Sequence, residues 1–273
     1  MRQNNIRLMK SLSLGKKELD KIAGILRKGI KDKVKESHAK GIVVGLSGGL
    51  DSSVVATLAK SAGVNVYGLI IPETGVTSPR DVEDAVTLAE KLKIKYSVIP
   101  LDWMLSSTRN SFPWADFPEN RKTSWGNAKA RLRMTLLYLA ANMGKRIVLG
   151  TGNRTELMLG YFTKHGDGGA DFLPIGSLYK TQIFQLAKHI GLPKEICVKM
   201  PSAGLWAGQT DESEIGLSYR EMDSILHYLL DKKLSVAKTT GKTKISESKV
   251  RKIRRRMQET SHKREIPQTI TLE

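Results

Sequence analysis

Short apolar runs alternate with amphipathic stretches through the first 150 residues of the chain. Four of these runs are rich in β-branched residues, as buried strands are; they cover residues 42–46, 64–71, 96–99 and 146–150. Apolar residues recur at helical spacing before or between these runs, over residues 16–37, 79–92 and 121–143. Strands that alternate with helices, joined by right-handed crossovers, predict an α/β fold with a doubly wound, mostly parallel sheet and helices on both faces.

The second half of the chain has a different pattern. Helical periodicity marks residues 178–189, 217–230 and 244–259, whereas residues 160–176 are rich in glycine and polar residues and residues 201–216 look like an irregular connection. There is no internal repeat and no low-complexity linker in the sequence. We therefore expect a single domain over residues 1–273, with a basic C-terminal helix and tail at about 244–273.

Composition sets the class of protein and its compartment. A hydrophobic fraction of 40% in 273 residues is typical of a globular chain. The single cysteine, Cys197, excludes an intramolecular disulfide, which fits a reducing compartment. No secretory signal is visible, and no apolar run approaches the roughly 20 residues of a membrane span. We expect a cytoplasmic protein that does not enter a membrane.

The formal net charge of +18 is high, and much of it lies between Lys232 and Arg264. A basic chain of this kind raises the question of nucleic-acid binding. A solvated basic helix and a positive cleft for anionic nucleotides would explain the same charge. Because the residues below indicate a nucleotide-using enzyme, we do not expect nucleic acid as a partner, and the sequence leaves the purpose of the excess charge open.

The segment Ser47–Ser53 follows the first apolar run and begins a helix. At such a junction several backbone N–H groups and the helix dipole point at one spot, which suits a phosphate. Gly48 and Gly49 allow close approach of the anion, and no lysine stands where a Walker A loop needs one. Asp51 lies within this anion site, which makes sense if Mg²⁺ joins its carboxylate to the phosphates. The alternative is a helix start capped by Asp51 or Ser52.

The run Ser-Gly-Gly-Leu-Asp-Ser at residues 47–52 resembles the pyrophosphate-binding loop of the N-type ATP pyrophosphatases, whose fold is adenine nucleotide alpha hydrolase-like. The resemblance implies cleavage of ATP between its α and β phosphates. AMP passes to an oxygen of the substrate, and an amine or sulfur nucleophile then displaces it. The loop indicates the superfamily and leaves the substrate open.

Further motifs narrow the choice to one family within this superfamily. They follow one another in order and together resemble the ammonia-dependent NAD synthetases; they cover residues 127–134, 150–156, 160–171, 178–182, 209–212 and 262–264. The resemblance implies that ATP adenylates the nicotinate carboxylate of deamido-NAD and that ammonia then displaces AMP, giving NAD. Another adenylating ligase, such as a tRNA-modifying enzyme, is the alternative.

The resemblance also assigns roles around ATP. It implies that Asp51 and Glu156 hold Mg²⁺ and that Asp51 and Lys180 act in catalysis. Lys180 opens a predicted helix, where the dipole disfavours a cation unless an anion lies close by. The ATP-binding residues that it implies are Gly45, Leu46, Ser47, Gly48, Gly49, Leu50, Asp51, Ser52, Thr151, Lys180 and Ser202. This chain departs from many relatives at Gly204, which replaces a carboxylate, so we assign that position no role.

The second substrate and the nitrogen source follow from the same resemblance. It implies that deamido-NAD contacts Arg131, Lys164, Asp171, His262 and Lys263. In the family this site lies across a two-fold dimer interface, so a homodimer is implied. Cys197 lacks the glycine-flanked turn of an amidase nucleophile, and the chain leaves no room for an amidase domain beside the synthetase. We therefore expect free ammonia as the nitrogen source.

Overall fold

The computed structural model describes residues 12–113, 121–267 and 269–270, so both ends of the predicted 1–273 domain lie outside the described residues. Its sheet is parallel and has the order β3-β2-β1-β4. The strands are β1 (Ile42–Gly45), β2 (Val66–Ile70), β3 (Lys95–Val98) and β4 (Ile147–Leu149). In the register Val44 of β1 lies opposite Gly68 of β2 and Leu149 of β4. The four predicted strands are confirmed: β1, β2 and β4 are slightly shorter than their apolar runs, and β3 begins and ends one residue earlier than predicted.

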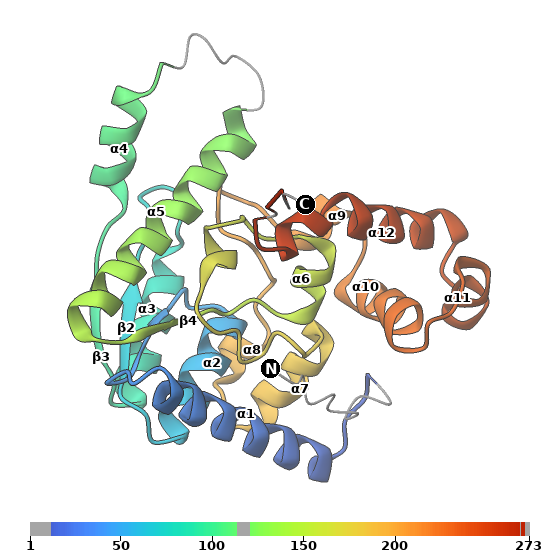
Figure 1. Ribbon diagram of the computed structural model, residues 1–273, viewed down its shortest axis with the longest axis horizontal. Coiled ribbons are helices and arrows are strands. Elements are labelled where there is room, and N and C mark those ends of the chain that lie inside the picture. The colour runs from blue at the N-terminus through green and yellow to red at the C-terminus, as the bar shows by residue number, and fades with distance from the viewer. Residues whose placement is uncertain (1–11, 114–120, 268, 271–273) are drawn as a thin grey trace.

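Helices cover both faces of this sheet, as predicted (Figure 1). On one face Ile42 and Val44 belong to a core shared with α1 (Lys16–Glu36), α2 (Leu50–Ser61), α3 (Pro79–Lys91) and α7 (Lys180–His189). On the other face Val43 joins a smaller core with Met134 and Leu137 of α5 (Arg121–Gly144). Alternate residues of one short strand thus pack against opposite layers, because successive side chains point to opposite faces.

The remaining helices and turns lie outside the sheet and the helices that cover it. Helix α4 spans Asp102–Ser111, and α6 (Arg154–Leu159) follows β4. The glycine-rich loop is irregular except for the 3-10 turn η2 (Asp167–Gly169). The rest of the chain contains α8 (Lys194–Cys197), α9 (Asp211–Ile215), α10 (Tyr219–Leu226), the π-helical turn η3 (His227–Asp231), α11 (Val236–Thr243), α12 (Glu247–Glu259) and the 3-10 turn η4 (Ser261–Arg264).

The expectation of an irregular connection over residues 201–216 is partly wrong. A short helix, α9, fills its end, and the Thr210 hydroxyl caps that helix by accepting from Ser213 N. Gly216 ends the helix with a φ of +77°, a conformation that glycine adopts without strain. A cap at Thr210 and a glycine six residues later were therefore the signals that the sequence offered for this helix.

Helices α10 to α12 lie beside the sheet region, at the right of Figure 1, and share a second core with α6 and α7. Met222, Ile225 and Leu226 of α10 are fully buried there, with Val250 and Ile253 of α12. Leu159 of α6 and Tyr179, just before α7, belong to the same core. The helical module of α10 to α12 therefore packs directly on α6 and α7.

Cations of the C-terminal segment cap the end of α6. Arg256 donates to the Leu159 carbonyl at 3.1 Å, Lys263 to the Gly160 carbonyl at 2.8 Å, and Arg264 to the carbonyls of Leu157 and Met158 at 3.2 and 3.1 Å. A helix leaves its last carbonyls without partners and is negative at this end, so cations stabilise it. Part of the excess positive charge therefore holds the tail against α6.

Among the described residues, the structure contains no helix with both the length and the apolar character needed to cross a membrane.

Candidate active site

The phosphate loop lies after β1, next to the point where the strand order reverses between β1 and β4. Gly48 has a φ of +73°, and a Cβ atom there would lie 2.0 Å from the Asp81 carbonyl oxygen, so only glycine fits. The Ser52 hydroxyl donates to the Gly49 carbonyl at 3.1 Å and lies 3.0 Å from the Ser47 hydroxyl. These bonds hold the turn in shape without a ligand.

The other loop residues have structural roles in addition to the predicted contact with ATP. Gly45 ends β1, and Gly49 is the N-cap of α2. Leu46 and Leu50 are buried in the core, so any contact that they make with a phosphate must come from their backbone. The predicted strand–turn–helix geometry is thus present.

Lys199 clamps this loop from outside, a contact that the sequence did not reveal. Its ammonium group donates to the Gly48 carbonyl at 2.9 Å and pairs with Asp81 and Asp84, both at 2.5 Å. Asp81 and Asp84 lie in the first turns of α3. The lysine therefore fixes the glycine turn against α3.

We expect Lys199→Met to weaken ATP binding by roughly 10- to 100-fold, the equivalent of one hydrogen bond to a charged group. The Gly48 carbonyl would lose its partner, and two carboxylates would be left close together. Calorimetric titration with ATP measures the effect. Lys194→Met, which removes an exposed lysine of α8, is the matched control. Equal affinities of the two variants would show that the clamp is not needed.

Three charged residues meet beside the loop. The Lys180 ammonium bonds the Asp51 carboxylate and lies 3.7 Å from Glu156 Oε1. Asn153 lies behind both acids: its side-chain amide donates to Asp51 Oδ1 at 3.3 Å, and its backbone N–H donates to Glu156 Oε2 at 3.1 Å. Asp51, Glu156 and Lys180 lie in the first turns of α2, α6 and α7, so three helix starts converge here.

Burial dominates the electrostatics of this cluster. It raises the pKa of Glu156 to about 8, helped by the negative charge of Asp51 and opposed by Lys180. Burial alone would lower the pKa of Lys180, but the two carboxylates outweigh it and raise that pKa, so the lysine stays protonated. The carboxylates also explain why a buried cation begins α7, where the helix dipole disfavours it.

Asp51 and Glu156 fit the predicted Mg²⁺. Both carboxyl groups face one point at the Lys180 ammonium, and when both are ionised the pair carries one negative charge more than the lysine neutralises. Mg²⁺ is usually held by one or two carboxylates together with phosphate oxygens and water, a donor set that this edge of the loop would offer. Within the described part of the chain, no three His, Cys, Asp or Glu side chains form a closed metal site. The pair therefore suits an ion shared with phosphate.

Asp211 and Tyr219 complete the walls of the cluster, and neither was assigned a role from the sequence. The Lys180 ammonium lies 5.2 Å from the centre of the Tyr219 ring, whose hydroxyl donates to Asp211 at 2.7 Å. Burial raises the pKa of Asp211, although its hydrogen bonds and Lys180 oppose the shift. The lysine is therefore enclosed by carboxylates and an aromatic face.

Thr151 and Ser202 lie on loops around this cluster. Thr151 is half-buried in the turn after β4, two residues before Asn153. Ser202 is exposed and accepts a hydrogen bond from Gly204 N at 3.1 Å. Its neighbour Pro201 accepts from Asp211 N at 3.2 Å, which places this segment beside the acidic cluster. Both residues thus lie on segments that border the charged cluster.

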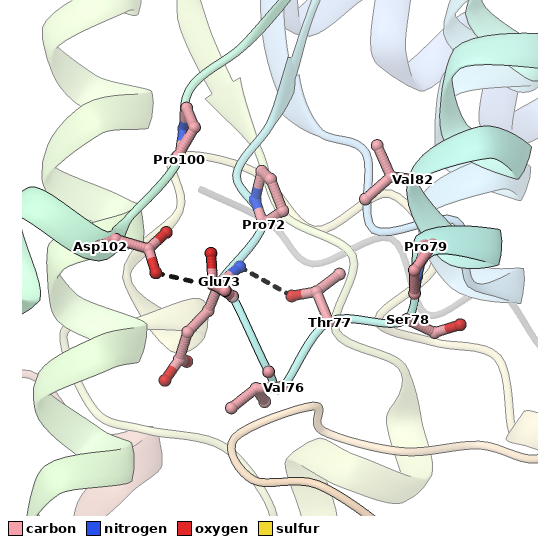
Figure 2. Close-up of a pocket in the computed structure, with 11 residues that line it drawn as sticks. Pro72, Glu73, Val76, Thr77, Ser78, Pro79, Val82, Pro100 and Asp102 are labelled. Carbon is pink, nitrogen blue, oxygen red and sulfur yellow. Dashed lines mark hydrogen bonds between the residues drawn. The ribbon is translucent and has the colours of Figure 1, made fainter.

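A pocket of about 540 Å³ opens beside the loop, at the carboxyl ends of β2 and β3. Figure 2 shows the two hydrogen bonds that shape its turn: Glu73 N donates to the Thr77 hydroxyl at 2.9 Å and Thr74 N donates to Asp102 at 3.1 Å. Its wall continues into the start of α3, which touches Gly48 through the Asp81 carbonyl. The pocket is large enough for the nucleoside part of a nucleotide.

A buried ion pair joins this turn to the connection that carries Ser202. Lys129 of α5 donates to Glu73 at 2.5 Å and to the Leu205 carbonyl at 3.0 Å. Arg133, one turn further along α5, donates to the Ile71 carbonyl at 3.2 Å. Helix α5 thus fixes two loops that flank the phosphate site, a link between distant segments that periodicity cannot predict.

Four of the five residues predicted for deamido-NAD lie together. Arg131 donates to the Lys164 carbonyl at 3.3 Å, and the Lys164 ammonium donates to the His262 carbonyl at 3.0 Å. Lys263 donates to the carbonyls of Gly160 and Phe162, both at 2.8 Å, and burial lowers its pKa. The tail therefore brings His262 and Lys263 to α5 and the glycine-rich loop.

Asp171 lies further along the same face of α5. Its two oxygens accept from the Tyr138 hydroxyl at 2.9 Å and from Val148 N at 2.8 Å. Tyr138 follows Arg131 by seven residues, or about two helical turns. Asp171 is exposed even with both bonds made, so it anchors its loop to β4 and still faces solvent.

The fold and the site together define a class. A parallel sheet in this order binds its ligand outside the carboxyl ends of the strands, at the reversal of strand order. Here that crevice lies between the phosphate loop after β1 and the acid-bearing turn after β4. The chain is therefore a nucleotide-binding α/β protein whose charged groups suit phosphate chemistry.

Similarity to known proteins gives the family. The model of the NAD synthase family matches residues 22–267. An NH3-dependent NAD+ synthetase from Archaeoglobus fulgidus is 46% identical over 240 residues, covering 87% of this chain and 91% of that protein. One from Methanocaldococcus jannaschii is 43% identical, covering 92% and 96%. The chain belongs to the NAD synthase family, as the motifs predicted, and these matches do not favour a tRNA-modifying enzyme.

Solved structures agree with this assignment. The NH3-dependent NAD synthetase from Campylobacter jejuni has a TM-score of 0.77 and 32% identity, covering 93% of this chain and 99% of that one. An NMN synthetase from Francisella tularensis has a TM-score of 0.82 and 36% identity, covering 95% and 100%. The predicted fold class is therefore confirmed.

Proposed function

We propose that this chain makes NAD from deamido-NAD, ATP and ammonia, releasing AMP and pyrophosphate. The observation that carries the proposal is the meeting of Asp51, Glu156 and Lys180 beside a phosphate loop, in a chain whose curated relatives are NH3-dependent NAD+ synthetases. A carboxylate must approach a triphosphate in this reaction, so the site must supply positive charge where phosphate charge develops.

ATP would lie across the carboxyl edge of the sheet. Its phosphates would accept from the backbone N–H groups of residues 47–52, with Thr151 and Ser202 at the sides, and its nucleoside would occupy the pocket by Pro72 and Pro100. Asp51 and Glu156 would hold Mg²⁺, which would supply positive charge at the phosphates. Lys180 keeps its proton because of the neighbouring carboxylates and would add a second positive charge.

Two chemical steps follow. A carboxylate oxygen of the nicotinate attacks the α-phosphorus, the bond from that phosphorus to the bridging oxygen breaks, and pyrophosphate leaves. The ammonia nitrogen then attacks the carboxyl carbon, the carbon–oxygen bond to phosphate breaks, AMP leaves and a proton is lost. The chain orients the two substrates and stabilises charge in both steps.

Deamido-NAD would bind along α5 and the glycine-rich loop. Arg131, Lys164 and Lys263 supply positive charge there, His262 can donate from its ring, and Asp171 faces solvent to accept from a hydroxyl. We further propose a homodimer through this helix, since α5 exposes the large apolar side chains of Leu139 and Met143. A cytoplasmic location rests on the single cysteine and stays a proposal.

The Francisella neighbour raises a second candidate, amidation of the mononucleotide to give NMN. The NH3-dependent NAD+ synthetases from Archaeoglobus fulgidus and Methanocaldococcus jannaschii are 46% and 43% identical to this chain, against 36% for that structure, which favours the dinucleotide.

An assay with purified protein distinguishes these functions. ATP, Mg²⁺ and ammonium are supplied with deamido-NAD or with nicotinate mononucleotide, and NAD, NMN and AMP are measured. We expect NAD formation at a higher kcat/KM than NMN formation, with one AMP per amide. Glutamine in place of ammonium should support no turnover. Absence of both AMP and amide product would refute the proposal, and faster NMN formation would reassign the substrate.

A further inference from the structure

Asp223 of α10 lies fully buried between the starts of α6 and α7, about 40 residues or more from either in sequence. Its Oδ1 accepts from the Thr155 hydroxyl at 2.5 Å, and its Oδ2 accepts from Thr181 N at 2.8 Å. Burial raises the pKa of this carboxyl, and the two hydrogen bonds oppose the shift. A buried carboxylate is costly unless its oxygens are well bonded, and both of these oxygens are.

These hydrogen bonds form a network that joins the backbone next to Glu156 to the backbone of Lys180. The Thr155 hydroxyl also accepts from Lys180 N at 3.0 Å. Thr155 immediately precedes Glu156, and Thr181 immediately follows Lys180. The spacing between the Glu156 carboxylate and the Lys180 ammonium is therefore set by backbone positions that Asp223 and Thr155 hold together.

A second acid of the same helical segment makes a parallel link. Asp231 bonds Arg154, the first residue of α6, and accepts from the Tyr179 hydroxyl at 3.0 Å, just before α7. In a regular α-helix, residues 223 and 231 would point about 80° apart. The π-helical turn η3 takes more residues per turn and returns Asp231 toward the side of Asp223. The turn thus lets one helical segment hold both helix starts.

We propose that Asp223, acting through Thr155, is a positioning residue of the synthetase reaction: it sets the distance between Glu156 and Lys180. The inference rests on the proposed roles of those two residues. The helical module, whose Tyr219 faces Lys180, is then part of the active site. Supporting groups of this kind typically contribute 10- to 100-fold in activity.

The test compares variants of the full chain at a temperature where circular dichroism shows all of them folded. Thr155→Val removes the hydroxyl at equal size, and Thr155→Ser retains it. Asp223→Asn keeps the shape of the acid but cannot accept from both donors. We expect Thr155→Val and Asp223→Asn each to lower kcat by about 10- to 100-fold with less than a threefold change in the KM for deamido-NAD. Thr155→Ser should recover most of the loss.

Two further measurements separate positioning from simple loss of stability. The double variant Thr155→Val, Asp223→Asn should be no slower than either single variant, because all three variants disrupt the same hydrogen-bond network. Val236→Ala shortens a buried side chain of the same module and should lower Tm while leaving kcat unchanged. A kcat of Thr155→Val within twofold of wild type, or additive losses in the double variant, would overturn the inference.

Glu156→Gln distinguishes this failure from a failure of the proposed site. If Glu156→Gln retains full activity, the roles of the charged cluster are wrong and the inference falls with them. If Glu156→Gln is impaired while Thr155→Val is not, the proposed roles of Asp51, Glu156 and Lys180 are retained and only the positioning role of Asp223 is wrong.

Discussion

Replacing Asp51 by asparagine should lower kcat by roughly 10²- to 10³-fold, the range measured when one charge-stabilising group is removed from an active site. Asparagine keeps the size of the side chain and can still accept from Asn153, but it loses the negative charge that faces Lys180 and the proposed Mg²⁺. The dependence of the rate on Mg²⁺ concentration should move to higher concentration at the same time. Steady-state NAD formation over a Mg²⁺ series measures both effects.

Asp32→Asn is the matched control for this experiment. Asp32 is a half-buried acid of α1 that pairs with Lys28 one turn away, and surface pairs of this kind contribute little to stability. Its kcat should equal that of wild type. Near-normal turnover of Asp51→Asn, or a loss in the control of similar size, would refute a metal-binding role for Asp51.

The sheet could be predicted from the sequence because β1, β2 and β4 are short apolar runs that end at a turn signal, whereas the edge strand β3 is only partly apolar. Buried parallel strands must be apolar on both faces, so Ile42–Gly45 and Val66–Ile70 stand out from the amphipathic helices around them. The phosphate loop could also be predicted, since Gly48 and the helix start after it are local features of the sequence. Local signals of this kind do not depend on which distant segments fold against them.

The supporting contacts of the site were not predictable in the same way. Lys199, Lys129 and Asp223 are ordinary charged residues in the sequence, and such residues are usually solvated. Their roles arise only when folding brings them to a carbonyl, a buried carboxylate or a helix start far away along the chain. The sequence offered one hint, the cation Lys180 at a helix start, and the structure adds two carboxylates beside it.

The charged tail shows why the excess basicity could not be interpreted from composition. The sequence left open whether the basic segment of Arg256, Lys263 and Arg264 is solvated or lines a positive cleft, and the structure shows their donors bonded to backbone carbonyls at the end of α6. The carbonyls of a helix end carry no signature in the sequence. Only the packing of α12 against α6 makes these cations structural, and the same helix α6 carries Glu156 at its other end.

Lys180→Met should lower kcat by about 10²- to 10³-fold and should also destabilise the fold. Methionine fills the same space, but the buried carboxylates of Asp51 and Glu156 are left facing each other without a cation. Breaking a buried ion pair on one side typically costs about 3–5 kcal/mol, so Tm should fall by several degrees.

The double variant Lys180→Met, Glu156→Gln removes one of the two negative charges that repel each other and should regain much of the lost Tm. It should not regain kcat, because the positive charge at the phosphates is still missing. Calorimetry and NAD formation measured on the same preparations test both statements. Recovery of kcat together with Tm would show that Lys180 serves only to stabilise the carboxylates, and its proposed catalytic role would then be wrong.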